Sequence, residues 1–172
     1  MAKSSSGSNA ASKEPPKDAP IKVISVNRQA YHDYFVERTI EAGISLVGTE
    51  IKSIRAGLAN LNNAFAKVEN GEIFLYDADI QPYVRASHTQ HEPKRPRKLL
   101  LHKSEIAKLF SASAVQGQAL VALRLYWKNS RVKVEIGIGR GKSTIDKRHD
   151  LKEKAIKRET DRTMASFNRR RA

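Results

Sequence analysis

The side chains best suited to catalysis or metal binding form two groups, His32 beside Asp33, and His88 with His91 and Glu92. A histidine next to a carboxylate is typical of a general base, and the second group offers ligand types that zinc accepts. Neighbouring residues of a strand point to opposite faces, however, and no helix sets the spacing of the second group. The chain also has no cysteine, which removes thiolate chemistry. We therefore expect a protein that is not an enzyme and that uses no metal ion and no cofactor.

Positive charge is the more informative feature of the composition. The chain carries 32 Lys and Arg against 18 Asp and Glu, a net charge of +14, and its pI is about 10.1. Such a charge predicts a polyanionic partner, and nucleic acid is the commonest one. Within residues 21–139 the positive side chains gather in the loop from Lys94 to Lys98 and on the last predicted hairpin, at Arg124, Lys128, Arg131 and Lys133.

The C-terminal segment, residues 140–172, holds 12 positive and 5 negative charges, so its +7 is half of the net charge. Its few apolar side chains do not form one continuous helical stripe, so burial cannot stabilise it. Its composition nevertheless favours a helix once a polyanion supplies the missing stabilisation. We expect a basic tail that is disordered when free. A solvated tail without a fixed partner is the alternative.

The remaining chain divides into a leader and one body. Residues 1–20 are rich in Ser, Ala, Lys and Pro and predict a disordered leader with neither a secretory signal nor a membrane anchor. Residues 21–139 are enough for one hydrophobic core. No stretch is apolar and long enough to span a bilayer, and a chain without cysteine fits a reducing cytoplasm.

The body begins with strand-like segments and a short helix. Residues 34–36 and 39–46 are rich in β-branched and aromatic residues, which predicts two strands or one bent strand, with a bulge or close approach at Gly43. Thr49 then caps a helix whose apolar positions are Ile51, Ile54 and Leu58. Glu50, Lys52 and Arg55 lie off that buried stripe, and Gly57 ends the helix.

Two hairpins and a second helix follow. Asn70-Gly71 between alternating segments predicts a hairpin, since both central residues of such a turn need positive φ. A long basic loop covers residues 81–98, and His102 caps a helix that directs Ile106, Leu109, Phe110 and Val115 inward. The last two strands meet at Asn129-Ser130, and Gly137, Gly139 and Gly141 mark the loss of packing where the tail begins.

These elements predict a mainly β fold. Six short strands with two or three inserted helices favour a closed or nearly closed barrel of the oligonucleotide-binding type, because closure removes exposed strand edges. An open antiparallel sheet covered on one side by helices is the alternative.

Several stretches of the sequence occur in one known family, in the same order. They are Asn27 to Ala30 with His32, Tyr34 and Glu37; Glu41 to Gly43; Gly48 to Gly57; Pro93 to His102; Tyr126 to Asn129; and Asp146 to Arg148. Through them the chain resembles the bacterial SsrA-binding protein family, small protein B, from about Asn27 to Asp150.

The resemblance implies a non-enzymatic, cytoplasmic partner of transfer-messenger RNA in trans-translation, a monomer in solution with no membrane partner. In that family an oligonucleotide-binding barrel holds the tRNA-like domain of the RNA. The tail enters the empty mRNA channel and decoding centre of a stalled small ribosomal subunit as a helix. The ribosome is thereby released and the incomplete peptide is tagged.

The resemblance also implies which residues act. By motif position Glu41, Leu100, His102 and Lys133 belong to the RNA-binding surface, and Lys98 and Lys128 join them as cations of the same motifs. Asp146, Lys147 and Arg148 form the decoding-centre motif. Ile145 stands where the family often has a His or Tyr ring, so this chain supplies no ring for stacking there.

Two other classes of function stay open. A general barrel-type RNA chaperone or ribosome-assembly factor has the same charge and would bind unrelated structured RNAs alike. An RNA-processing enzyme built on the histidine groups is the other.

Overall fold

The structure is a computed structural model that describes residues 21–83 and 90–171, without the side chains of residues 150, 151, 154 and 165–171. The predicted leader and His88 lie outside the described residues. In chain order the elements are β1 (Lys22–Val26), α1 (Arg28–Asp33), β2 (Tyr34–Ile44), α2 (Gly48–Arg55), β3 (Ala59–Asn60), β4 (Phe65–Glu69), β5 (Glu72–Tyr76), β6 (Asp79–Ile80), β7 (Arg97–Leu100), α3 (Lys103–Ser113), β8 (Gln118–Lys128), β9 (Arg131–Gly141) and α4 (Thr144–Arg171).

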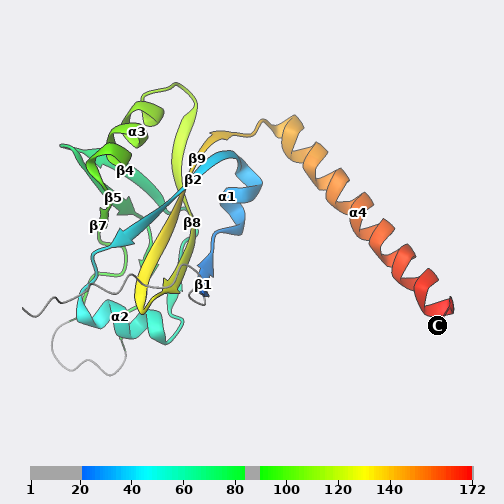
Figure 1. Cartoon of the computed structure of the whole chain (residues 1–172), viewed down its shortest axis with the longest axis horizontal. Helices are drawn as coiled ribbons and strands as arrows, with labels where there is room; N and C mark the ends of the chain where they lie inside the picture. The colour runs from blue at the N-terminus through cyan, green and yellow to red at the C-terminus, as the bar shows by residue number, and fades with distance from the viewer. Residues whose placement is uncertain (1–20, 84–89, 172) are drawn as a thin grey trace, which may run out of the picture.

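Seven antiparallel strands form one sheet in the order β1-β8-β4-β5-β7-β2-β9, and β9 also pairs with β8 (Figure 1). Six of these strands therefore run in a ring from β8 through β4, β5, β7, β2 and β9 back to β8. The ring is nearly closed but is not formally a barrel, because β4 meets β8 only where Phe65 lies opposite Val121. The first strand, β1, takes up the same edge of β8 between Arg124 and Trp127. The mainly β prediction is confirmed at this level.

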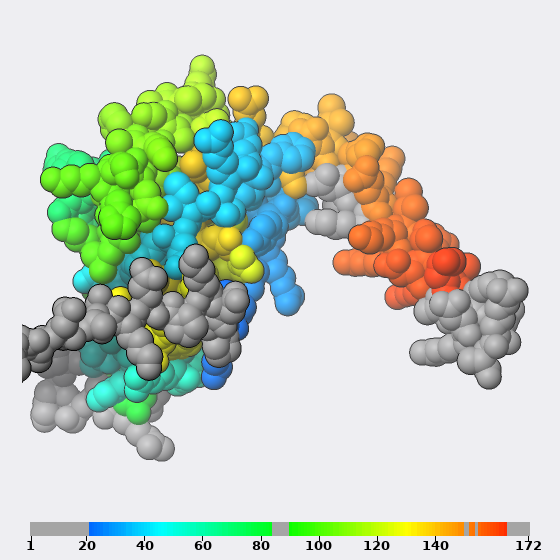
Figure 2. Space-filling view, viewed as in Figure 1, coloured from blue at the N-terminus to red at the C-terminus, as the bar shows by residue number. Residues whose placement is uncertain are grey.

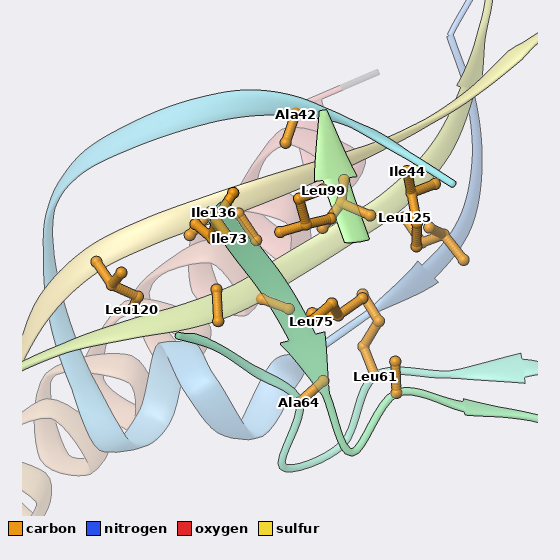
Figure 3. Packing of buried hydrophobic residues seen from close by; sticks show 14 of the residues in the cluster. Ala42, Ile44, Leu61, Ala64, Ile73, Leu75, Leu99, Leu120, Leu125 and Ile136 are labelled. Carbon is orange, nitrogen blue, oxygen red and sulfur yellow. The ribbon is translucent and has the colours of Figure 1, made fainter. Parts of the chain in front are cut away.

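The core lies inside the ring, where buried side chains of all six ring strands meet. Figure 3 shows the contributions of β2, β5, β7, β8 and β9. Ala42 of β2, Ile73 of β5 and Ile136 of β9 are each 0% exposed, and Leu99 of β7 is 2% exposed. These residues alternate with outward-facing ones, as the pleat of a strand requires. The outer surface of the ring carries the charged residues together with a smaller apolar cluster, in which Val121 and Leu123 of β8 pack against Ala30 of α1.

Both predicted hairpin turns are confirmed. Asn70 and Gly71 join β4 to β5 with φ of 50° and 76°, and Asn129 and Ser130 join β8 to β9 with φ of 50° and 59°. Positive φ at both central residues gives the turn a twist that matches the twist of the strands. The register of each hairpin is therefore set locally.

The segment predicted as two strands or one bent strand, residues 34–36 and 39–46, is a single strand, β2. Its register against β9 shifts between Val36 and Arg38, so the irregularity precedes Gly43. At Gly43 the backbone instead passes close to β7, since an added Cβ would lie 3.2 Å from Leu100 Cβ. Of the two predictions for this glycine, the close approach is the correct one.

The short helix α2 departs from its prediction in two ways. Its N-cap is Val47, so Thr49 lies within the helix. Ile54 is buried as expected, but Glu50 is also fully buried at 0% exposure. Placing Glu50 off the buried stripe was wrong, because Glu50 lies one helical turn before buried Ile54 on the same face, where its carboxylate pairs with Arg97 of β7.

The second predicted helix, α3, packs less of its surface than expected. Leu109 is completely buried and Ile106 packs against the core. Phe110 and Val115 are 58% and 48% exposed, so their inward assignment was wrong. Val115 lies beyond the last helical residue, Ser113, where the helical periodicity no longer applies.

The glycines near the end of the body have a different role from the one predicted. Gly137 and Gly139 are buried inside β9, where it pairs with β2 next to the register shift between Val36 and Arg38. A Cβ at Gly139 would lie 2.7 Å from the backbone oxygen of Phe35. Gly139 therefore permits a close approach of β2 to β9, and packing is not lost until Gly141.

The C-terminal segment is one helix of 28 residues, α4, which runs away from the body (Figure 1). Its described part stands clear of the body as an arm (Figure 2). Ile145, Ile156 and Met164 are 77%, 64% and 59% exposed, which agrees with the expected lack of a buried face. Disorder of this segment in the free protein stays a prediction.

Candidate nucleic-acid interface

A cluster of charged side chains on the outer surface of the ring centres on Glu41 of β2. The Tyr126 hydroxyl of β8 donates to Glu41 Oε2 at 2.6 Å. The ammonium groups of Lys128 and Lys133 lie 2.9 Å and 3.7 Å from the same carboxylate. The neighbouring strands β8 and β9 thus place one cation each beside the carboxylate of β2.

This arrangement keeps Glu41 ionised. Burial raises the pKa of Glu41, but the hydrogen bonds from Lys128 and Tyr126 outweigh burial, so the pKa lies below its ordinary value. Burial and the adjacent carboxylate together raise the pKa of Tyr126. At neutral pH the tyrosine is therefore a donor, and the cluster carries a net positive charge.

One hollow joins this cluster to β7 and the start of α3. Most of the residues assigned by resemblance to the RNA-binding surface line it, namely Glu41, Lys98, Leu100, His102 and Lys133. They come from β2, β7, the N-cap of α3 and β9, and the pairing of β2 with β7 on one side and β9 on the other brings them together. Leu100 is 55% exposed, and Lys98 forms an ion pair with Glu72. Lys128 does not line the hollow, but its ammonium group lies 2.9 Å from the carboxylate of Glu41, which does.

The N-cap of α3 behaves as predicted. The His102 backbone N–H donates to Glu105 Oε2 at 2.9 Å, which satisfies one of the free donors at a helix start. The imidazole of His102 is exposed at the rim of the hollow. The imidazole of His102 is therefore available to a ligand.

A second hollow shares Leu100 and Lys133 with the first and extends toward α2. Arg55, Trp127 and Arg131 line it as well. The guanidinium of Arg55 lies 5.8 Å from the centre of the Trp127 ring. Arg55 was missing from the sequence-based site, although its position off the apolar stripe of α2 was a usable signal.

The basic loop before β7 is only partly available to a ligand. Arg97 is 0% exposed, and its Nε donates to Glu50 Oε1 at 2.8 Å. Arg95 donates to the two oxygens of Glu50 at 2.8 Å and 2.7 Å. Arg97 also donates to the carbonyl oxygens of Ala78 and Pro93. Two of the predicted phosphate-binding cations therefore hold the loop together instead.

The pKa values of the buried pair reflect this network. Burial raises the pKa of Glu50, but donation from Arg95, Val47 and Arg97 outweighs burial and lowers it overall. Burial lowers the pKa of Arg97. A buried carboxylate with several donors stays charged and holds the donating side chains in place.

Among the described histidines of the two groups, His91 and His32 both have hydrogen-bond partners within the protein. His91 is 8% exposed, with Nδ1 3.0 Å from Thr49 Oγ1 and Nε2 3.0 Å from the Ile80 oxygen. Across residues 21–83 and 90–171, no three potential metal ligands come together. His32 and Asp33 lie in α1, not in a strand, so the opposite-face argument was wrong. Their Nδ1 and Oδ1 atoms are 2.9 Å apart.

Asp33 also binds the start of α4. Lys147 Nζ lies 2.8 Å from Asp33 Oδ1. Hydrogen bonds from Lys147 and His32 lower the pKa of Asp33 to about 2. Asp146 accepts from the Ser143 backbone at 3.0 Å and from its hydroxyl at 2.7 Å, while Arg148 is exposed.

The nearly closed ring, its cationic outer surface and the charged helical arm define a class, namely small, strongly basic, mainly β proteins with a helical C-terminal extension. Within that class the chain belongs to one family. The family described as SmpB protein matches residues 24–166, which includes the ring and most of α4.

Similar proteins carry the same assignment. The chain is 55% identical over 141 residues to the SsrA-binding protein of Bacillus pumilus (strain SAFR-032), covering 82% of this chain and 90% of that protein. It is 54% identical over 141 residues to the SsrA-binding protein of Bacillus velezensis (strain DSM 23117 / BGSC 10A6 / LMG 26770 / FZB42), covering 82% and 90%. The family membership expected from the sequence is thereby confirmed.

A solved structure has the same fold over most of the chain. It is described as "tmRNA-SmpB: a journey to the center of the bacterial ribosome", and it superposes with a TM-score of 0.60 at 43% identity. The match covers 69% of this chain and 84% of that one. Among the described residues, none of the helices combines the length and apolar character needed to cross a membrane.

Proposed function

We propose that this protein binds transfer-messenger RNA and acts with it on stalled ribosomes in trans-translation. The observation that carries the proposal is the hollow in which β2, β7, β9 and α3 bring Glu41, Lys98, Leu100, His102 and Lys133 together. Its chemistry suits a folded RNA, and the relatives at 55% identity are SsrA-binding proteins.

The body would recognise RNA through phosphates, 2′-hydroxyls and shape. Lys98, Lys128 and Lys133 each hold a carboxylate at the surface, so they are ordered before RNA arrives. An incoming phosphate can share or replace that carboxylate at little cost in side-chain order. Exposed Leu100 offers an apolar contact to a sugar or an unstacked base. Such a surface reads a structured RNA by its form, as double-stranded RNA is generally read. We infer that the ring is an oligonucleotide-binding-type barrel that holds the tRNA-like domain.

The arm would act on the ribosome. Its exposed apolar side chains and its excess of positive charge leave its helix without support from the body. Ordering about twenty residues costs on the order of 1 to 2 kcal/mol each, so many phosphate contacts are needed to offset it. The empty mRNA channel and decoding centre of the small subunit provide them, and Asp146, Lys147 and Arg148 would enter there. The protein would work as a cytoplasmic monomer without a membrane partner.

The proposal is tested by capture of the full-length chain from a bacterial lysate, followed by sequencing of the bound RNA. One dominant transfer-messenger RNA species is expected. The matched variants are Lys133→Ala, inside the hollow, and Lys108→Ala, an exposed lysine of α3 outside it. The first should recover less of that RNA and the second the same amount as wild type.

Equal recovery of many unrelated structured RNAs at physiological salt would point instead to a general RNA chaperone or ribosome-assembly factor. The pair of variants separates the two outcomes further. A general binder would lose affinity by a similar factor at both lysines, because it would depend on overall charge.

A further inference from the structure

The two oxygens of the Glu41 carboxylate have different surroundings. Oε2 accepts from the Tyr126 hydroxyl at 2.6 Å and from Lys128 Nζ at 2.9 Å. Among the described residues, the cation beside Oε1 is Lys133, whose Nζ lies 3.7 Å away, too far for a hydrogen bond. A carboxylate oxygen can accept about two hydrogen bonds. The protein therefore uses Oε2 and leaves the accepting capacity of Oε1 for a ligand.

Oε1 lies on the side of the hollow between β7 and the start of α3. Glu41 and Lys133 both line that hollow, whereas Tyr126 and Lys128 do not. The two side chains that bind Oε2 therefore stand behind the carboxylate, and the oxygen beside Lys133 faces the space that a ligand would enter. The side chains of Glu41 and Lys133 are 34% and 29% exposed, so a ligand can reach both.

Tyr126 reaches this carboxylate from two strands away. It lies opposite Lys133 in the pairing of β8 with β9, and Lys133 lies opposite Gly43 in the pairing of β9 with β2. The phenol therefore extends across β9, a span of two strand spacings of about 4.8 Å each. Only 6% of Tyr126 is exposed, and burial together with the hydrogen bond to Glu41 raises its pKa, so the hydroxyl remains a donor. Tyr126 is thus hidden from a ligand and can act on one only through Glu41.

We propose that Tyr126 is a positioning residue of the RNA-binding surface, whose hydroxyl holds Glu41 Oε2 so that Oε1 accepts a hydrogen bond from a donor on the RNA. The inference rests on the proposed function for the identity of that RNA. RNA offers such donors in its 2′-hydroxyls and in the N–H groups of its bases, whereas an ionised phosphate offers only acceptors. Lys133 beside Oε1 suits a phosphate. The surface would then bind a donor and a phosphate side by side, a requirement that positive charge alone does not impose.

The test is a double-mutant cycle on RNA affinity in the full-length chain. Tyr126→Phe removes one hydroxyl and keeps the ring, so the affinity should fall by about three- to tenfold, the effect of one hydrogen bond. In a chain that carries Glu41→Ala, the same change should have no further effect, because the carboxylate that Tyr126 positions is gone. Effects that multiply in the double variant would overturn the proposal, since Tyr126 would then act independently of Glu41.

Tyr76→Phe is the matched control for the cycle. The Tyr76 hydroxyl also donates to a carboxylate of the ring, Glu69 Oε2 at 3.0 Å, but neither residue lines the hollow. This variant should bind RNA as wild type does. Urea unfolding shows that each variant is folded under the binding conditions. An equal loss of affinity in Tyr76→Phe and Tyr126→Phe would also overturn the proposal.

Glu41→Gln separates the role of the acceptor from the role of the charge. Tyr126 and Lys128 both donate, so the amide oxygen should take the place of Oε2 and direct the NH2 group at the ligand. A donor then meets a donor, and binding should be at least as weak as in Tyr126→Phe. If Glu41 acted through its charge alone, the substitution would relieve repulsion of the phosphates and strengthen binding. Stronger binding by Glu41→Gln would therefore contradict the inference.

The choice of RNA separates this inference from the proposed function. If wild type binds transfer-messenger RNA no more tightly than an unrelated folded RNA of similar length, the proposed function is wrong, and the cycle can still be measured on either RNA. Single 2′-deoxy substitutions in the tRNA-like domain then identify the donor. A position at which the deoxy sugar weakens binding by wild type but not by Glu41→Ala assigns the donor to a 2′-hydroxyl. The absence of such a position assigns it to a base N–H.

Discussion

The body and the arm of this protein use their charges in opposite ways. In the body, carboxylates hold the cations in place: Glu50 binds Arg95 and Arg97, Glu41 binds Lys128, and Glu135 binds Arg124. In α4, Ile145, Ile156 and Met164 are mostly exposed and the positive charge is in excess. The body is therefore stabilised from within, whereas these apolar side chains of the arm gain little from burial.

This difference fits a protein whose two parts meet RNA at different times. A surface that is ordered beforehand loses little entropy on binding and suits recognition of one folded RNA. A segment that gains order only on its partner suits a site that is open only in one state of a large assembly. Each prediction below separates the two parts.

Removing α4 by ending the chain after Gly141 should have the largest effect. The core residues lie between Ala42 and Ile138, so the body should fold and keep its affinity for transfer-messenger RNA. Tagging on stalled ribosomes should be lost. Binding is measured by filter retention and tagging by the appearance of the tagged peptide. Loss of RNA binding with intact tagging would contradict the division of roles.

Glu50→Gln should strongly destabilise the body. The substitution preserves the shape of the side chain but leaves buried Arg97 without its counter-charge, which costs about 3 to 5 kcal/mol in comparable buried pairs. Urea unfolding followed by circular dichroism measures the change. Glu153→Gln in α4 is the matched control, because that carboxylate is 68% exposed, and it should leave the midpoint unchanged. Equal effects at the two sites would show that the ion pairs of Glu50 do not stabilise the body.

Gly139→Ala should destabilise the pairing of β2 with β9. The new Cβ would lie 2.7 Å from the Phe35 oxygen, so the backbone of β2 must shift, at about 1 to 3 kcal/mol. Gly141→Ala is the control, since a Cβ there meets nothing within 4 Å. The difference between the unfolding free energies of the two variants is the informative quantity. No difference would mean that the two strands adjust freely at this position.

Lys133→Ala should weaken RNA binding by about fivefold. The slope of log affinity against log salt concentration should fall by about 1, which corresponds to the loss of one phosphate contact. Stability should change little, because Lys133 lies 3.7 Å from Glu41 in a weak ion pair. A salt titration of RNA affinity measures both quantities. Lys108→Ala should change neither the affinity nor the slope.

The smallest effect is expected from pH. The folded pKa of Asp33 is about 2, below its ordinary value of 3.8, so the contact with Lys147 contributes fully above about pH 3.8 and is lost as the pH falls toward 2. Between pH 7.5 and 5 the contribution of this contact to the free energy of unfolding should therefore stay constant. Urea unfolding of the wild-type chain and of Lys147→Ala at several pH values measures that contribution. A difference between the two chains that changes within this interval would mean that another group controls the contact.

Much of the fold could be predicted because its signals are local. The turns at Asn70-Gly71 and Asn129-Ser130 depend on two residues with positive φ, and the strands beside them alternate by the geometry of the backbone. The lack of a buried face on α4 depends on periodicity within one segment. The errors at Thr49, Phe110 and Val115 all fall within or near a helix end, where periodicity alone does not fix the boundary.

The candidate site was predicted through family motifs more than through physics. Motif positions brought Glu41, Lys98, Leu100, His102 and Lys133 into one group, and the ring places them in one hollow. The positive charge of the loop also made Arg95 and Arg97 candidates for contact with a polyanion, although both form ion pairs with buried Glu50. The sequence-based site missed Arg55 beside Trp127.

Local chemistry thus specified the turns, the strands, the net charge and the missing apolar face of the arm, since each follows from neighbours along the chain. Tertiary packing alone specified which charged side chains form ion pairs with distant residues. Glu50 meets Arg97 across 47 positions, and Asp33 and Lys147 are separated by most of the body. Whether a cation faces solvent or a buried carboxylate depends on partners that are distant in the chain and that meet only in the folded protein.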